Sequence, residues 1–301
     1  MQPLVTVGVP TYNRGALSER AVRSALDQDY SPIEVVVSDD ASTDDTSERF
    51  ARLAQEDPRV RYVRQPANLG HARNFQAVLD AARGDYFMWL SDDDWIDAAY
   101  ISGCLGVLEA NGGYSLVGGL PRYYSNGHHV VDERPTNLLS TRPGLRVLAY
   151  VARVNVNGAL FGVARRADLQ RLSFKDEVGG DWLLVAGLAA RGRVRTLPTV
   201  HIHRSIEGLS SDEERLARSF GMGGLLARHH HFVVAARFAR EIVSEPQYGA
   251  LTRLQRVVAG SLAAILILLR FPGQALLRRL LQALGLGGLE PRVIAWVRSR
   301  D

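Results

Sequence analysis

The chain of 301 residues lacks several features that would mark a particular class of protein. It has one cysteine, Cys104, which excludes an intrachain disulfide framework and leaves a zinc site to rely on histidine and carboxylate ligands. No G-x-G-x-x-G and no G-x-x-x-x-G-K-[ST] follows an expected strand, which argues against a dinucleotide cofactor or a P-loop. The N-terminus has neither the basic flank nor the apolar core of a signal peptide, so we expect a cytoplasmic location.

Charge is distributed unevenly along the chain. The formal net charge is +4, but residues 1–214 hold 23 basic and 28 acidic residues, whereas residues 215–301 hold 13 arginines and four acidic residues. A basic C-terminal region favours an anionic partner such as a membrane surface. One uncharged run in this region, 257–269, is shorter than the roughly 20 residues that a membrane-spanning helix needs.

The C-terminal region shows helical periodicity. In residues 274–285 the leucines share one face of a helix, and Arg278 and Arg279 lie elsewhere, which is typical of a helix in a membrane interface. Packing against the rest of the chain, or a homodimer interface, accounts for the same pattern. We therefore expect residues 212–301 to be a basic helical region, with these three roles open.

The first 120 residues alternate short β-branched segments with segments of helical periodicity. This alternation predicts βαβ units and a Rossmann-like, mostly parallel sheet between helices, an α/β fold. The expected strands are 4–9, 33–37, 60–63, 86–90 and 115–117, and the expected helices are 17–27, 46–55, 72–82 and 98–109.

The second half of the chain is less regular. Residues 155–165 are expected to form a strand, and residues 178–192 a glycine loop that enters a helix at Asp181. Residues 194–204 return as strand, with His201 and His203 on one face because strands have a period of two. We expect one domain over 1–211, made of two halves, 1–120 and 121–211.

Polar and acidic residues follow the expected strands. The segments are PTYNR (10–14), SDDASTDDT (38–46), NLGHARN (68–74) and SDDDW (91–95). Because sheets of this kind bind ligands beyond the carboxyl ends of their strands, these segments should line one rim of the sheet.

Three consecutive aspartates require an explanation, because adjacent carboxylates repel one another. Asp94 precedes a helical segment and is expected to be its N-cap. A cap does not account for Asp92 and Asp93. Hard divalent cations such as Mg²⁺ or Mn²⁺ are held by one or two carboxylates plus substrate phosphates, so the pair favours a metal-bound nucleotide diphosphate.

Asp39 lies directly after a strand, where a ligand would bind. A carboxylate there accepts a hydrogen bond from N3–H of uracil or thymine, and Tyr12 from the neighbouring loop stacks on the base. Both bases offer the same N3–H, so UDP and dTDP donors are not separated.

Taken together, these segments with GDYFMWLSDDDW (84–95) and GGDW (179–182) resemble glycosyltransferase family 2, inverting enzymes with the GT-A fold. The resemblance covers about residues 3–210. It implies a donor nucleotide site, a metal held by Asp93 and approached by His203, and Asp181 as catalytic base. The implied donor-binding residues are Pro10, Thr11, Tyr12, Arg14, Asp39, Arg73 and Asp92.

The sequence departs from the common family pattern at two places. Ser91 replaces the first aspartate of the metal-binding element, which leaves any role for Ser91 in doubt. Gly180 replaces the glutamate that precedes the family's catalytic aspartate, so a second carboxylate is missing there.

The resemblance implies metal-dependent transfer of a sugar from a UDP- or dTDP-sugar to a carbohydrate or lipid-linked acceptor in cell-envelope synthesis. We expect a cytoplasmic enzyme, peripheral on the inner face of the membrane, without a nucleic-acid partner. Two alternatives remain: a nucleotidyltransferase, which VPTYNRGAL (9–17) fits poorly, and a non-catalytic membrane-associated carbohydrate- or nucleotide-binding module. Catalytic turnover of a sugar donor would distinguish an enzyme from the non-catalytic module.

Overall fold

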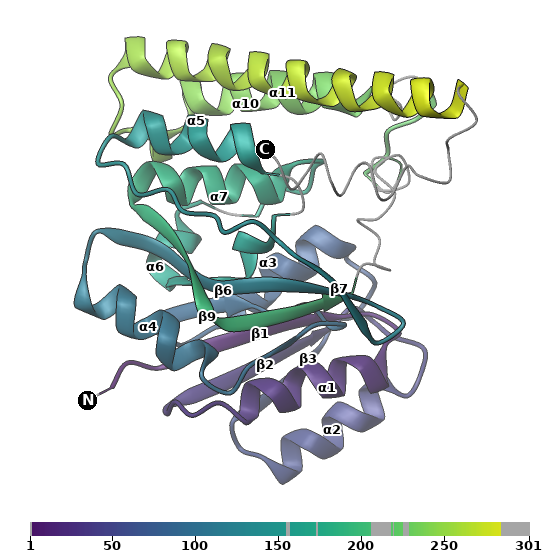
Figure 1. Cartoon of the computed structure of the whole chain (residues 1–301). Coiled ribbons are helices and arrows are strands. Elements are labelled where there is room, and N and C mark those ends of the chain that lie inside the picture. Colours follow the sequence, from purple (N-terminus) through teal and green to yellow (C-terminus); the bar gives the residue numbers. More distant parts are fainter. Residues whose placement is uncertain are drawn as a thin grey trace.

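The computed structural model describes residues 2–154, 157–172, 174–205, 218, 220–224 and 229–283, with side chains to residue 269 (Figure 1). Within these residues, strands lie in one mixed sheet with the order β3-β2-β1-β4-β8-β6-β9-β5, and β7 pairs with β6. The strands are β1 Val5–Thr11, β2 Ile33–Asp39, β3 Val60–Arg64, β4 Tyr86–Trp89, β5 Trp95–Ile96, β6 Tyr114–Ser125, β7 His128–Asp132, β8 Val163–Arg165 and β9 Arg193–Ser205.

Helices cover both faces of this sheet, with α1 and α2 on one face and α3 on the other (Figure 1). The helices of the described residues are α1 Gly15–Leu26, α2 Thr46–Glu56, α3 His71–Ala81, α4 Tyr100–Ala110, α5 Pro143–Arg153, α6 Arg166–Gln170, α7 Gly180–Arg191, α10 His230–Ser244 and α11 Arg253–Ala283, with short 3-10 turns η1 Gly158–Phe161 and η3 Pro246–Tyr248.

The N-terminal half is the parallel part of the sheet. Strands β1, β2, β3 and β4 pair in parallel, and every residue of β1 and β2 is buried. A strand covered on both faces is a continuous apolar run, and the valines of these strands meet that requirement. The expected α/β fold with a mostly parallel sheet is confirmed, because the antiparallel pairings that β5, β7 and β8 add are short.

The strand expected over 155–165 is largely wrong. Residues 158–161 form η1, and only Val163–Arg165 are strand. Asn157 has left-handed backbone geometry (φ 53°), which ends an extended run, and residues 155 and 156 lie outside the described part of the chain. Gly158 is required here because a Cβ would lie 2.4 Å from Cγ of Pro121.

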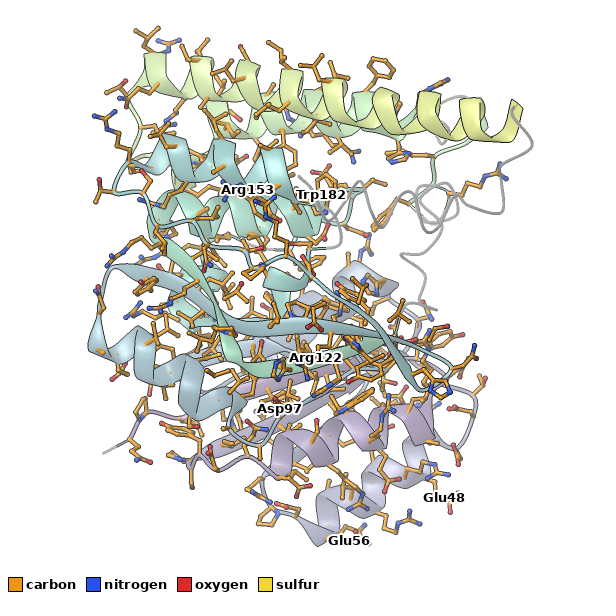
Figure 2. The ribbon with its side chains drawn as sticks, in the orientation of Figure 1. Glu48, Glu56, Asp97, Arg122, Arg153 and Trp182 are labelled. Carbon is orange, nitrogen blue, oxygen red and sulfur yellow. The ribbon has the colours of Figure 1, made fainter. Side chains whose placement is uncertain are left out.

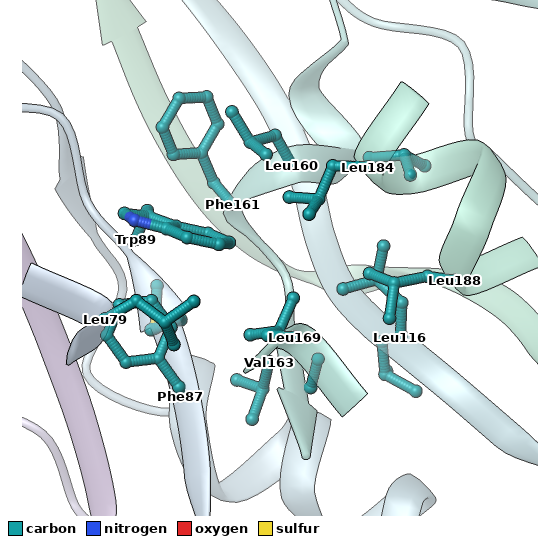
Figure 3. Packing of buried hydrophobic residues seen from close by; sticks show 14 of the residues in the cluster. Leu79, Phe87, Trp89, Leu116, Leu160, Phe161, Val163, Leu169, Leu184 and Leu188 are labelled. Atoms are coloured by element: carbon teal, nitrogen blue, oxygen red, sulfur yellow. The ribbon is translucent and has the colours of Figure 1, made fainter. Parts of the chain in front are cut away.

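The two halves share one hydrophobic core (Figure 3). Trp89 at the end of β4 is 1% exposed, packs edge-on against Phe87, and donates its indole N–H to the Phe75 carbonyl at 2.9 Å. Leu160 from η1 and Leu184 from α7 point into the same cluster. The core thus fixes the end of β4 relative to the start of α7, and both carry predicted site residues.

The C-terminal helices α10 and α11 pack over α5 and α7 (Figure 1). Phe238 and Ile242 of α10 and Ala263 of α11 are fully buried, so packing against the rest of the chain is observed. No helix in the described residues is both long and apolar enough to cross a membrane. The expected boundary at 211/212 and residues 284–285 lie outside the described residues, as do the side chains of 274–283.

Candidate active site

Two chain segments meet beyond the carboxyl ends of β1 and β4, which are neighbours in the sheet. Thr11 ends β1 and donates its hydroxyl to Oδ2 of Asp92 at 3.1 Å. Arg14, just before α1, donates from one nitrogen, Nη1, to Oδ1 of Asp92 at 3.1 Å and Oδ2 of Asp93 at 3.0 Å. The structure therefore brings three predicted donor-site residues against the predicted metal ligand.

The two carboxylates converge on one positive charge. Burial raises the pKa of Asp92 to about 6, against the attraction of Arg14. Arg14 Nη1 lies between the two carboxylates, so a divalent metal held by both of them would have to displace the guanidinium, and this role stays a prediction. Within the described residues, no three His, Cys, Asp or Glu side chains form a complete metal site, so substrate phosphates would have to supply further ligands.

His203 lies beside this cluster but is engaged elsewhere. Its Nε2 contacts Asp97 Oδ1 at 2.7 Å and its Nδ1 contacts the Tyr124 hydroxyl at 3.0 Å. Asp97 also accepts a hydrogen bond from His201 Nδ1 at 2.8 Å. Binding of a metal by His203 would require one of its contacts to break, and this role stays a prediction.

Asp94 is not a helix cap, contrary to expectation. The short strand β5 separates it from α4, and the N-cap position is Ala99. Its carboxylate is 1% exposed and accepts a hydrogen bond from Nε of Arg204 at 2.9 Å. The third aspartate is therefore half of a buried ion pair.

Arg204 is a functional candidate that the sequence reasoning missed. Its guanidinium lies 4.2 Å from the Phe161 ring centroid and donates to the Tyr123 hydroxyl at 3.2 Å. Tyr123 in turn donates to Oε2 of Glu133 at 2.8 Å. The available signal was an arginine inside a strand pattern, directly after the histidine that drew attention.

The predicted base-binding aspartate, Asp39, is fully buried at the end of β2. Its Oδ1 accepts the backbone N–H of Ser42 at 2.8 Å and its Oδ2 accepts the Tyr62 hydroxyl at 2.6 Å. Asp40, which sequence reasoning did not single out, holds the 68–70 loop through backbone N–H groups of Leu69 and Gly70 at 2.6 and 3.1 Å. Both acids shape the rim, and base recognition by Asp39 stays a prediction.

The remaining predicted donor residues surround this rim. Pro10 is buried in β1, whereas Tyr12 is 45% exposed, and stacking of its ring on a base stays a prediction. Arg73 on α3 is exposed and pairs with Asp176 at 3.3 Å. It contacts the 174–179 loop, which leads to the predicted base.

Asp181 lies in the first turn of α7, as expected. Its Oδ2 accepts a hydrogen bond from Nδ2 of Asn157 at 2.8 Å, and burial raises its pKa. The N-cap position is Gly179, so a capping role does not explain Asp181. In Figure 2, Trp182, which follows it, lies in the helical layer, and Asp97 lies on the other side of strands β6 and β9.

The missing glutamate at position 180 has a steric explanation. A Cβ on Gly180 would lie 2.2 Å from the carbonyl oxygen of Lys175, so the tight 174–179 loop accepts only glycine there. Residues of helix α10 contact this loop. Arg237 pairs with Glu177 at 3.0 Å, Lys175 Nζ lies 3.8 Å from buried Glu241, and Val234 packs on Gly179.

Residues 6–166 match the family model of Glycosyl transferase family 2. The chain is 31% identical over 189 residues to the GalNAc(5)-diNAcBac-PP-undecaprenol beta-1,3-glucosyltransferase of Campylobacter jejuni, a match that covers 60% of this chain and 57% of that protein. It is 36% identical over 92 residues to the putative colanic acid biosynthesis glycosyl transferase WcaA of Escherichia coli, covering 31% of this chain and 33% of that one.

Two solved structures have a similar fold. One is S. aureus TarS, with a TM-score of 0.59 at 17% identity over 86% of this chain and 42% of that chain. The other is the mannosyltransferase PcManGT from Pyrobaculum calidifontis in complex with GDP-Man and Mn2+, with a TM-score of 0.53 at 20% identity over 90% and 87%. The fold agrees with the GT-A expectation, and the match to the family model extends over more than half of the sequence. The chain belongs to glycosyltransferase family 2.

Proposed function

We propose that the protein transfers a sugar from a nucleotide diphosphate donor to an acceptor hydroxyl, with inversion at the anomeric carbon. The observation that carries this proposal is one geometry: Asp92 and Asp93 converge on the Arg14 guanidinium beyond the end of β4, and a separate carboxylate, Asp181, lies in the first turn of α7. Arg204 pairs with Asp94, the residue after Asp93, and is close enough to attract Asp181 electrostatically.

The donor would lie along the rim formed by β1, β2 and β4. In this proposal Tyr12 stacks on the base, Asp39 accepts the base N3–H, and Pro10, Thr11, Arg14 and Arg73 surround the nucleoside and phosphates. The TarS structure in complex with UDP-GlcNAc, with a TM-score of 0.55, supports a UDP-sugar on this fold. A dTDP-sugar satisfies the same contacts.

Asp92 and Asp93 would hold Mn²⁺ or Mg²⁺, which on binding would neutralise the charge that develops on the leaving diphosphate. Asp181 would accept the proton of the acceptor hydroxyl as that oxygen attacks the anomeric carbon from the face opposite the diphosphate. The raised pKa of Asp181 suits a group that must take up a proton.

The acceptor we propose is lipid-linked or a growing polysaccharide. The Campylobacter relative is named for a diphospho-undecaprenol acceptor, and the Escherichia coli relative for colanic acid biosynthesis. This chain covers only 57% of the first relative and 33% of the second, so the acceptors in their names are proposed for this chain and do not follow from the similarity alone.

Calorimetric titration of the full chain with UDP, dTDP, GDP and ADP tests the donor site. We expect one nucleotide to bind with Mn²⁺ and to lose most of its affinity in excess EDTA or in Asp93→Ala. Asp80→Ala, an exposed acid on α3, is the matched control and should bind normally. Absence of binding under every condition would favour the non-catalytic module, and release of pyrophosphate during turnover would favour a nucleotidyltransferase.

We also propose that α11 rests on an anionic membrane surface at the inner face of the membrane. The outward side of its N-terminal half carries six exposed apolar side chains and no exposed acid, and the exposed Arg253 and Arg240 of α10 add positive charge nearby. This is the pattern of an interfacial helix. The apolar residues are Leu254, Val257, Val258, Leu262, Ile265 and Leu269.

Vesicle sedimentation tests this face. The protein should sediment with vesicles containing phosphatidylglycerol and much less with pure phosphatidylcholine, and L262S/I265S should reduce sedimentation several-fold. Leu17→Ser, an equally exposed leucine on α1, is the control and should change nothing. The membrane role would be contradicted if the protein stayed in the supernatant with both kinds of vesicle. If its sedimentation coefficient then showed a dimer, and the double variant were a monomer, the face would be a homodimer interface instead.

A further inference from the structure

Asp181 ends a chain of hydrogen bonds that starts on a different helix. The Tyr150 hydroxyl of α5 lies 2.7 Å from Oδ1 of Asn157, and Nδ2 of Asn157 lies 2.8 Å from Oδ2 of Asp181. Tyr150 and Asn157 are 1% and 3% exposed. Solvent therefore does not compete for either side of the Asn157 amide, so the amide is held between two fixed partners.

The direction of these hydrogen bonds follows from the chemistry of the groups. An ionised carboxylate only accepts hydrogen bonds, so the NH₂ of Asn157 must face Asp181 and the carbonyl oxygen must face Tyr150. The Tyr150 hydroxyl then donates to that oxygen and prevents the amide from turning over. Backbone N–H groups at the start of α7, those of Asp181 and Trp182, also donate hydrogen bonds to the Asp181 carboxylate.

The backbone places the amide where it is needed. Asn157 has φ 53°, a conformation that asparagine and glycine adopt far more readily than other residues. Tertiary contacts hold it there: the next residue, Gly158, donates its N–H to Glu133 Oε2 at 3.2 Å. The strained residue is therefore fixed on one side by Glu133 and on the other by Asp181.

We infer that Asn157 is a positioning residue for sugar transfer, and that its amide, by binding Oδ2, holds the Asp181 carboxylate in the orientation in which it takes the proton of the acceptor hydroxyl. This inference rests on the proposed function, in which Asp181 is the base. Among the described residues, the charge of Arg204 on β9 acts on Asp181, and the charges of Asp181 and of Glu133, after β7, both act on Tyr150 of α5. The substitutions of Asn157 proposed below alter none of these three side chains.

Asn157→Gly tests the side-chain amide without disturbing the backbone, because glycine also adopts the left-handed conformation and the substitution removes only the side chain. We expect kcat to fall about 10- to 100-fold, as for other groups that orient a functional side chain, with the KM for donor changed by less than about twofold. Tyr150→Phe removes the group that orients the amide and should give a smaller fall of the same kind.

Asn157→Asp gives a second, distinct readout. It places a carboxylate against Asp181, and two adjacent carboxylates resist ionising together, so the pKa of the pair rises. Because the base must be deprotonated to act, the acidic limb of the kcat–pH profile should move to higher pH. In Asn157→Gly the same limb should move in the same direction by less, because a hydrogen bond that favours the charged form is lost.

Asn126→Gly is the matched control, since Asn126 is a left-handed asparagine (φ 48°) in the hairpin turn between β6 and β7. It should leave kcat and the pH profile unchanged. If Asp181→Asn is inactive but Asn157→Gly matches the unaltered protein in kcat and pH profile, the role of Asn157 is wrong and the proposed function stands. If Asp181→Asn retains activity, the base assignment itself is wrong.

Discussion

Asp181→Asn is expected to lower kcat about 10²–10⁴-fold, the usual contribution of a general base. The change removes the group that takes the acceptor proton and keeps the shape of the side chain. Asn157 can still donate to the remaining carbonyl oxygen, so the start of α7 should be undisturbed. The measurement is initial-rate kinetics with the donor identified by titration, together with calorimetric affinity for the nucleoside diphosphate.

Donor binding decides whether the loss of activity is catalytic. The donor rim is built from β1, β2 and β4, and Asp181 belongs to α7, so the nucleotide Kd should change by less than about twofold. Asp80→Asn, at an exposed acid of α3, serves as a control that should keep full activity. Loss of nucleotide affinity in Asp181→Asn would move this residue from the acceptor side to the donor side of the site.

Arg204→Met is expected to lower the free energy of unfolding by about 3–5 kcal/mol, the cost of leaving one partner of a buried ion pair alone. Asp94 is 1% exposed and the Arg204 side chain is 12% exposed, so water cannot replace the lost contact. Without Arg204, the Asp94 carboxylate must stay charged in an apolar site or take up a proton. Urea unfolding at neutral pH measures the loss.

Two comparisons make this result specific to the buried pair. Arg23→Gln removes an exposed arginine that pairs with Glu19 at 2.6 Å, and should cost less than about 1 kcal/mol. The double variant Asp94→Leu/Arg204→Met removes both charges and should recover a large part of the stability. A loss in Arg204→Met no larger than that in Arg23→Gln would show that the pair contributes little to folding.

Local patterns predicted the parallel half of the fold because its strands and helices follow from neighbouring residues. The valines of β1 and β2 form continuous apolar runs, and the predicted helices in this half agree with α1, α2 and α3 to within about two residues at each end. The segment 155–165 failed because its conformation depends on partners far away in the sequence. Gly158 lies against Pro121 and Glu133, and no local pattern reports such contacts.

The candidate site shows the same division. Clustering of polar residues after β1 and β4 predicted that Arg14, Asp92 and Asp93 would meet, because strand order alone brings them together. The partner of Asp94 could not be predicted, since Arg204 is separated from it by 110 residues and is brought to it only by the pairing of the two-residue strand β5 with β9. The residues next to Asp94 suggested only a helix cap, whereas its carboxylate pairs with Arg204, which is distant in the sequence.

The contacts of α10 with the 174–179 loop limit which C-terminal sequences can be combined with the rest of the chain. Arg237 and Val234 belong to the basic C-terminal region, yet they contact the loop that directly precedes α7 and Asp181. The C-terminal region is therefore not an interchangeable appendage. A chimera that exchanged it for the corresponding part of a relative would place a foreign surface against the 174–179 loop, so the two parts should be engineered as one unit.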